Sequence, residues 1–321
     1  MKKILNLFLI LFTLNSVAQV QLDNQETAIN FLESYFSPVG HVLGTGLNSG
    51  WFNTAKTHKL GGFDLTMNFN FIEIPDNLLS FDPNSINGLS STSNETPNIF
   101  GAGKGAEISY SLNDNDTVVF KMPDQEIELN NLPVPTLNLG VGLIKETELN
   151  FRYIPTTNFN FGFISDGQID LIGFGFKHNL IQWLPIANKF PIDLSFQGAF
   201  TNFKLNMLIE DDNLSQSINL NTTASNYNLI LSKKILMFTP FISFGSSTSS
   251  TQFNTDTSLL FGEGSQQITI DDIPTNLVFN RVNASSIGVG IRIQLTLLSL
   301  HISQTFSDYN TTSIGAGISF R

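Results

Sequence analysis

The sequence of 321 residues contains no cysteine, so neither a disulfide nor a lipid-modified cysteine can support the fold. It has only four histidines, and without cysteine they are too few to suggest a zinc or other transition-metal cluster. Charged residues make up 13% of the chain, against about a quarter in soluble proteins. The balance of 16 basic and 27 acidic residues is acidic, which argues against nucleic acid as a partner. We therefore predict no metal and no other cofactor.

The chain also lacks any later apolar run of the eighteen or so residues that a transmembrane helix needs. A shorter run, Ile4 to Leu14, follows two lysines and is followed by small residues that end at Ala18. A positive start, a short apolar run and a small-x-small site are typical of a secretory signal peptide. We predict that residues 1–18 are this peptide and are cleaved after Ala18.

What the chain has instead is alternation of apolar and polar residues. In residues 311–321, Ile314, Ala316, Ile318 and Phe320 alternate with small or polar residues, which is the period of a strand with one apolar face. With its penultimate aromatic, this end resembles the C-terminal strand by which bacterial outer-membrane barrels are recognised and inserted. The resemblance implies that Ile318 and Phe320 belong to the insertion signal.

Similar alternation recurs along the chain, which is rich in phenylalanine. A soluble β-sandwich would show it too, but the segments have the nine to eleven or so residues of a tilted membrane strand. Short turns also alternate with longer polar loops, for example 155–167 and 210–215. We predict an all-β, antiparallel transmembrane β-barrel of twelve strands, or fourteen if weak strands within 117–130 and 252–270 take part. The twelve are residues 61–73, 104–112, 117–121, 136–144, 147–155, 168–178, 190–205, 216–231, 236–250, 281–296, 298–307 and 311–321.

Residues 19–60 differ from the rest. Gln25 to Phe36 has apolar residues at helical spacing, with Asn24 as a possible N-cap and Pro38 just beyond the end. A glycine-rich stretch follows. We predict a helix and a plug-like segment in residues 19–60, folded into the lumen of a barrel formed by residues 61–321. A tail resting at the periplasmic mouth is the alternative.

Three segments carry a family resemblance: the stretch from Gly46 to Leu65, Gly173 to Pro185, and Ser285 to Arg321. Together they resemble an uncharacterised family of Bacteroidetes outer-membrane proteins. The resemblance covers most of the chain after the signal peptide, and it implies a barrel in the outer membrane of a Gram-negative bacterium, without a substrate. Outer-membrane lipid and the barrel-assembly machinery are the partners that such a location implies. A plug-like segment before a barrel is also similar to long-chain fatty acid transporters.

Several charged or titratable residues fall on the predicted inward faces, where they avoid the cost of facing lipid. They have two possible roles: an ion-pair network that fills the barrel, or the lining of a selective pore. His301 shares a face with Ser299 and Ser303, but a lumenal histidine among hydroxyls is more often a hydrogen-bonded filler, so we predict no catalytic residue and no enzyme. The candidates are Asp64, Glu107, Glu148, Arg152, Lys177, Asp193, Arg292 and His301.

We therefore predict a channel or transporter for small solutes. An apolar solute is preferred because outer loops carry Phe161, Phe163, Leu259, Leu260 and Phe261. Its route would follow wall positions with spare volume. The alternative is a non-transporting structural or surface-interaction barrel whose outer loops bind a partner. The wall positions proposed for the route are Gly140, Gly142, Gly173 and Gly175.

Overall fold

The structure is a computed structural model that describes residues 20–21, 24–111, 117–161, 164–184, 191–211, 214–255, 259–263, 266–270 and 277–320. The predicted signal peptide, residues 1–18, lies outside these residues, as do Phe163 and Arg321. Within the described residues, no helix is both long and apolar enough to cross a bilayer.

Strand β2 (Phe63–Glu73) follows the alternation of its sequence. Its four apolar side chains from Phe63 to Phe69 are 41–47% exposed, whereas the four polar side chains from Asp64 to Asn70 are at most 8% exposed. On β18 (Thr311–Phe320), Ile318 and Phe320 likewise lie on the exposed side. The sheet therefore turns its apolar face outward and its polar face inward.

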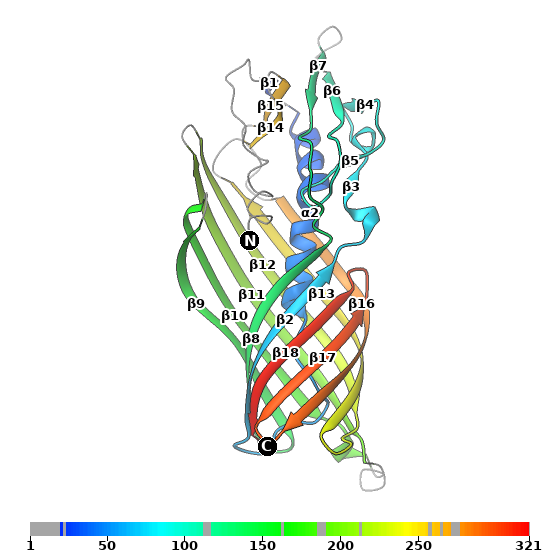
Figure 1. Ribbon diagram of the computed structural model, residues 1–321, viewed down its shortest axis with the longest axis vertical. Helices are drawn as coiled ribbons and strands as arrows, with labels where there is room; N and C mark the ends of the chain where they lie inside the picture. The colour runs from blue at the N-terminus through cyan, green and yellow to red at the C-terminus, as the bar shows by residue number, and fades with distance from the viewer. Residues whose placement is uncertain are drawn as a thin grey trace.

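Ten strands among the described residues pair into a closed antiparallel barrel (Figure 1). The chain closes the ring by pairing β18 with β2. Short turns join the strands at one end, the lower end in Figure 1, which we call the short-turn end; the opposite end is the long-loop end. The ring also contains β8 (Asn131–Gly142), β9 (Thr147–Phe161), β10 (Ile164–Asn179), β11 (Asp193–Asp211), β12 (Leu214–Ser232), β13 (Phe238–Asn254), β16 (Leu277–Leu295) and β17 (Leu298–Phe306).

The predicted strand count was wrong, and the surplus strands form small sheets at the long-loop end. Residues 104–112 and 117–121 contain β6 (Glu107–Ser111) and β7 (Thr117–Lys121), which pair with each other outside the ring, and β6 also pairs with β4 (Leu89–Ser91). They alternate because one face is buried against protein: Ile108 and Phe120 are fully buried. The segment considered for a fourteenth strand forms β14 (Leu259–Glu263) and β15 (Gln266–Ile270), which pair with β1 (Val20–Gln21).

Two of the predicted long loops are strand instead. β9 runs to Phe161 and β10 starts at Ile164, and β11 and β12 stay paired up to Asp211 and Leu214. The long-loop ends of these strands are rich in polar residues, so their sequence resembled that of a loop. In Figure 1, β11 and β12 rise beyond the rest of the wall.

The N-terminal helix was predicted, but its end was wrong. α2 (Gln25–Asn48) begins at the N-cap Asn24, whose side chain accepts hydrogen bonds from the backbone N–H groups of Glu26 and Thr27. It continues through Pro38 and the glycines. Close packing overrides their poor helix propensity: a Cβ at Gly40 would lie 2.8 Å from Phe279 Cβ, and one at Gly46 would lie 2.5 Å from Val134 Cγ2.

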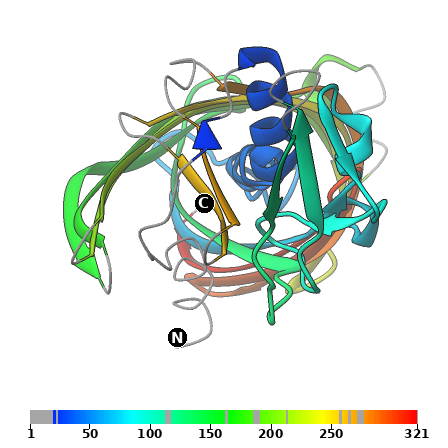
Figure 2. The same cartoon turned by 90° about the horizontal axis from the view of Figure 1, so that it is seen from above.

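The second half of α2 lies in the lumen, where it contacts β12, β13 and β16. Figure 2 shows the helix within the outline of the ring. Residues 49–60, which we call the strap, leave the helix and lead to Gly61 and β2 at the short-turn end. Most strap side chains are buried, with Ala55 fully inaccessible. The plug-like segment predicted for residues 19–60 is thus the second half of the helix plus the strap.

The first half of α2 packs against residues 74–130, which we call the insert, between β2 and β8. The insert contains β3 (Ser80–Phe81), which pairs with β5 (Thr96–Pro97), and the 3-10 helices η1 (Asp76–Leu78) and η2 (Pro83–Ser85); a third, η3 (Ile181–Trp183), lies at the short-turn end. The Phe31 ring meets the rings of Phe81 and Phe120 edge to face at 6.0 Å. One helix therefore belongs to two parts of the molecule: an apolar core that it shares with the insert and with barrel strands, and the filling of the lumen.

Candidate functional site: the plugged lumen

Arg152 on β9 holds the end of α2. Its side chain is 1% exposed; Nη1 donates to the Leu47 carbonyl at 2.7 Å and Nη2 to the Ser49 carbonyl at 2.5 Å. Nε donates to Asn138 Oδ1 at 2.6 Å. The last carbonyls of a helix have no partner inside it, and they favour a cation. A buried guanidinium is therefore satisfied mainly by backbone of the plug, with no carboxylate needed.

Trp51, the third residue of the strap, fills the lumen beside Arg152. The guanidinium carbon lies 3.9 Å from a Trp51 ring centroid, a cation–π contact, and the indole N–H donates to the Leu47 carbonyl at 3.1 Å. A Cβ at Gly173 or Gly175 would lie 3.1 Å from the indole. These glycines were predicted to offer spare volume to a solute, and that prediction was wrong because the strap occupies the space.

The other two wall glycines are covered as well. A Cβ at Gly140 would lie 3.0 Å from side-chain oxygens of Asn150 and Asp64, and one at Gly142 would strike the Lys59 carbonyl. The small residues of the wall therefore accommodate the protein's own chain and side chains.

A buried charged cluster fixes the strap nearer the short-turn end. Glu148 on β9 is 2% exposed, and its Oε2 accepts from the His58 backbone N–H at 3.0 Å and lies 2.7 Å from His58 Nδ1. Its Oε1 lies 3.0 Å from Lys177 Nζ on β10. One wall carboxylate thus binds both the strap and a neighbouring wall cation.

Arg292 on β16 holds the strap from the opposite side of the ring. Nη1 donates to Asn53 Oδ1 at 2.6 Å and lies 3.9 Å from Asp64 Oδ2. Asp64 Oδ2 is also 3.8 Å from His58 Nε2. The two carboxylates and three basic groups lie close together, so each carboxylate has basic partners within a small volume, as buried charges require.

Neutral hydrogen bonds complete the attachment of the strap. Ser232 Oγ on β12 accepts from the Ala55 backbone N–H at 3.1 Å and lies 3.2 Å from Thr54 Oγ1. Ser195 on β11 donates to the Ala55 carbonyl at 2.5 Å. The strap is therefore attached to strands on several sides of the ring.

Most of the predicted lumen residues lie where expected, but two do not line the lumen. Asp193 is the first residue of β11, at the short-turn end, where it borders a hollow that also includes Lys56. Glu107 is exposed on β6, outside the ring, so the prediction that it lines the lumen was wrong. The strand alternates because one of its faces is buried against protein and not because it belongs to the barrel wall. The six that are buried on the inner face are Asp64, Glu148, Arg152, Lys177, Arg292 and His301.

His301 is 5% exposed, and neither ring nitrogen has a hydrogen-bond partner within the described residues. No serine hydroxyl is therefore hydrogen-bonded to it in the part of the chain that the structure covers. The described residues also contain no group of three or more His, Cys, Asp or Glu side chains able to hold a metal ion.

The strap residues that meet the wall were missed by the sequence reasoning. Neither Trp51 nor His58 was among the predicted lumen residues. A usable signal was present: Glu148, Arg152 and Arg292 are charges on inner faces, and buried charges need partners close by. The partner of each charge depends on the path of the strap through the lumen, and the periodicity of the sequence does not predict that path.

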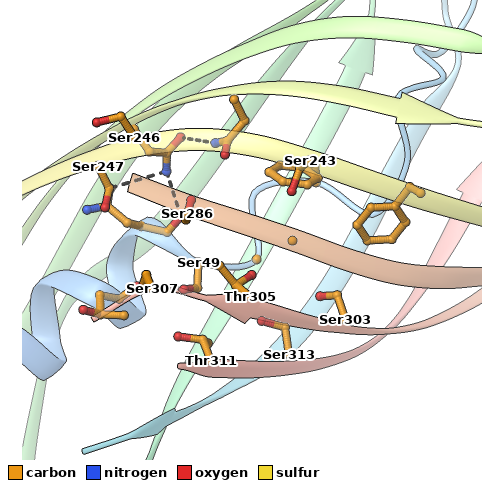
Figure 3. A pocket seen from close by; sticks show the side chains of 18 of the residues that line it. Ser49, Ser243, Ser246, Ser247, Ser286, Ser303, Thr305, Ser307, Thr311 and Ser313 are labelled. Atoms are coloured by element: carbon orange, nitrogen blue, oxygen red, sulfur yellow. Dashed lines mark hydrogen bonds between the residues drawn. The ribbon is translucent and has the colours of Figure 1, made fainter. Parts of the chain in front are cut away.

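The lumen also keeps a polar cavity of about 60 Å³ between the end of α2, the start of the strap, and β12, β13 and β16–β18. A buried water molecule needs roughly 10–15 Å³, so the cavity has room for only a few molecules of that size. The ten lining residues labelled in Figure 3 are all serine or threonine.

Comparison with known families gives one match: the model of DUF6588, a family of unknown function, matches residues 1–320. The predicted resemblance to an uncharacterised family is confirmed at that level, whereas the Bacteroidetes origin and the likeness to long-chain fatty acid transporters stay predictions. Comparison with curated proteins gives no match.

Among solved structures, the chain is similar to barrels from Gram-negative bacteria. The translocator domain of the autotransporter NalP from Neisseria meningitidis has 7% identity and a TM-score of 0.29, covering 92% of this chain and 98% of that one. The β-domain of the Bordetella autotransporter Brka has 8% identity and a TM-score of 0.32, covering 81% and 99%. An outer-membrane channel from Pseudomonas putida F1 has 8% identity and a TM-score of 0.27, covering 83% and 98%. At such low scores, function has to be argued from this chain's own lumen.

Proposed function

This chain belongs to the DUF6588 family, and because the function of that family is unknown, we propose a function from the lumen itself. We propose that the protein is an outer-membrane channel for small polar solutes, held closed by its own strap. The observation that carries the proposal is that the lumen is filled by a chain segment that hydrogen bonds and ion pairs attach to the wall on several sides, beside two small apolar clusters.

The location follows from the outer face. Each of the ten barrel strands bears at least one large, exposed apolar side chain, such as Phe174 at 52%, Ile287 at 48% and Ile302 at 48%. In water, an apolar surface of this extent would be unfavourable, whereas the hydrocarbon of a membrane favours it. The ring closes through the pairing of β18 with β2, as a bilayer favours, and its shortest seam is that between β8 and β9, which pair only over Asn138–Gly142 and Glu148–Arg152. With the short-turn end in the periplasm, Ile318 and Phe320 end the chain on the lipid-facing side, as an insertion signal would.

The closed state follows from the strap. Arg152, Glu148 and Arg292 reach it from different strands, and Ala55 is fully buried among wall side chains. The attachments through Arg152, Glu148 and Arg292 are hydrogen bonds or ion pairs that water can replace. The apolar contacts that release of the strap would expose are those of Trp51, Phe52 and Ala55.

The class of solute follows from the inner wall. Polar side chains such as Asn68, Asn70 and Thr222 are fully buried on inner faces, and the remaining cavity is lined by hydroxyls. An apolar solute would remove hydrogen-bonding partners from these groups and return none. We therefore propose a polar solute in place of the apolar one expected from the outer loops. The side chains of Phe161, Leu259, Leu260 and Phe261 lie outside those that the structure describes.

A second candidate, a static structural or surface-interaction barrel, is favoured by the first half of α2. That half is built into the core of the insert. If the strap never leaves, the lumen is only filling, and the insert presents a surface to a partner.

A disulfide lock separates the two candidates, because the chain has no cysteine of its own. Thr54 Oγ1 and Ser232 Oγ lie 3.2 Å apart, so the pair T54C and S232C brings two sulfurs within reach of a bond. A loosened background, Glu148→Ala with Asn53→Ala, removes two strap attachments. In planar bilayers we expect the loosened variant to conduct ions, oxidation of the pair to stop the current, and reduction to restore it.

The matched controls are T54C alone and S232C alone in the same loosened background, for which oxidation should change nothing. If the loosened variant stays closed even though a thiol reagent reaches the new thiol of T54C, the strap has left without opening a path. That result would exclude the channel and favour the static barrel.

Location is tested separately. We expect the protein to fractionate with outer membranes and to migrate faster on unheated than on heated gels. We also expect Phe320→Ala to lower the assembled fraction, because the chain would lose the aromatic side chain near its end that the assembly machinery would recognise. Recovery of most of the protein in soluble periplasm would contradict the location.

A further inference from the structure

The polar cavity in Figure 3 brings several hydroxyls together around one open space. On the cavity wall, five hydroxyl side chains on the adjacent strands β13, β16 and β17 make no hydrogen bond within the described residues. They are Ser243, Ser246, Ser286, Ser303 and Thr305.

Two buried polar groups bordering the same cavity also lack partners. Arg281 on β16 is 7% exposed, and its Nε has no hydrogen-bond partner within the described chain. Thr45, in the last turn of α2, is 5% exposed, and its hydroxyl is unpaired in the same part of the chain. Orphaned buried polar groups are rare and costly, so two of them beside an open space suit that space to a polar ligand.

Arg281 supplies the only charge among the described residues that border the cavity. Its Nη1 and Nη2 donate to Ser247 Oγ at 3.2 Å and Ser307 Oγ at 3.3 Å. Its nearest carboxylate, Asp308 Oδ2, is 3.7 Å away on a side chain that is 68% exposed. Although the chain has 27 acidic residues, none of the described residues that border this cavity carries a carboxylate, and one carries a guanidinium.

Gly288 makes room on the wall between two of the free hydroxyls. A Cβ there would strike Ser243 Oγ and lie 3.5 Å from Thr305 Oγ1. The absence of a side chain at this position lets both hydroxyls reach the cavity.

We propose that this cavity binds a small oxyanion. Several hydroxyls can donate to its oxygens, and Arg281 supplies the positive charge, in a charge-assisted arrangement. A cation would meet a guanidinium and no carboxylate, and an apolar molecule would leave the hydroxyls unpaired. The volume of about 60 Å³ limits the ligand to a few heavy atoms. The inference rests on the proposed channel only in naming its solute class; the binding itself needs no transport.

Equilibrium dialysis of the purified full chain against radiolabelled inorganic phosphate tests the site directly, with the strap in place. We expect one saturable site per chain, displaced by sulfate and unaffected by chloride at equal ionic strength. Arg281→Gln should weaken binding at least tenfold. The matched control is Lys204→Gln, which removes an exposed cation of β11 away from the cavity and should leave binding unchanged.

Arg281 also packs near Tyr309, so its replacement can disturb folding. Gly288→Ala provides a second variant that keeps every charge and fills the cavity; it should weaken binding at least threefold while heat-dependent gel mobility stays that of the wild type. Phosphate uptake that does not saturate, or equal affinity in Gly288→Ala and wild type, would overturn the site. Either result leaves the channel to be decided by the disulfide lock, so the two proposals fail separately.

Discussion

The two ends of the N-terminal segment are held in opposite ways. At the long-loop end, Phe31 and Leu32 of α2 are fully buried in an apolar core shared with the insert. In the lumen, the strap is held mainly through Asn53, His58 and backbone carbonyls, by hydrogen bonds and ion pairs. Water can replace polar contacts at modest net cost, but exposing an apolar core has no such compensation. One end is therefore a permanent attachment, and the other can be released while the first holds.

The largest expected effect is at the permanent end. Phe31→Ala removes a ring that is fully buried and that contacts Phe81 and Phe120, at a cost of about 4 kcal/mol. We expect limited proteolysis in detergent to cut the insert much faster, while the barrel keeps its heat-dependent gel mobility. Gln25→Ala, on the exposed first turn, serves as the control. An insert that stays protected in Phe31→Ala would mean that the helix does not hold it.

At the releasable end, Glu148→Ala should cost about 3 kcal/mol, because Lys177 and His58 lose their shared carboxylate while still buried. The comparison predicts that the strap loosens and the insert does not. A cysteine placed at Ala55 should react faster with a thiol reagent, with proteolysis of the insert unchanged. Glu146→Ala, on the neighbouring turn, should alter neither. Equal loosening of strap and insert would show that the two ends are not independent.

Gly44 lies in the lumenal half of α2, between these two ends, directly over Ser249. Gly44→Leu should cost roughly 1–3 kcal/mol through overpacking, and Gly44→Ala less. We expect the loss as a lower midpoint of urea unfolding in lipid vesicles, graded with side-chain size. If both variants unfold like the wild type, the helix does not press on the wall at this point.

A single neutral contact of the strap should matter least. Thr54→Val removes the hydrogen bond to Ser232, worth about 1 kcal/mol, together with the local one that the Thr54 hydroxyl accepts from the Lys56 backbone N–H. A double-mutant cycle with Ser232→Ala isolates the pair, and a coupling energy near zero would mean that this contact does not hold the strap.

The wall was predictable from the sequence because one rule governs it. A strand with lipid on one side and a polar lumen on the other must alternate, so β2, β10, β16 and β18 could be located by period alone. The same rule misled for β6 and β7, since a small sheet with one face on a protein core alternates equally well. Alternation shows that a strand has one apolar face, but it does not show whether lipid or protein covers that face.

The lumen was less predictable because its contacts join distant residues. The inward direction of Glu148 and Arg292 followed from their strands, but their partners His58 and Asn53 depend on the path of the strap. The glycines at 40, 44 and 46 appeared to break the helix, yet they let it approach the wall. Helix propensity is a local property, and it was overridden by packing that only the closed ring creates.

The direction of α2 has a consequence for how the molecule is put together. β1 pairs with β15 at the long-loop end, and the strap ends at the short-turn end, where β2 begins. In sequence order, the chain therefore crosses the lumen once before its first barrel strand. The pairing of β18 with β2 closes the ring around this N-terminal segment, which is covalently joined to β2. The first half of α2 packs against the insert at the long-loop end, so the N-terminal segment is held outside the lumen as well as inside it. Co-expressing residues 19–60 with a truncated barrel should consequently fail to restore the occluded form, since the order of events, and not only the contacts, determines the final topology.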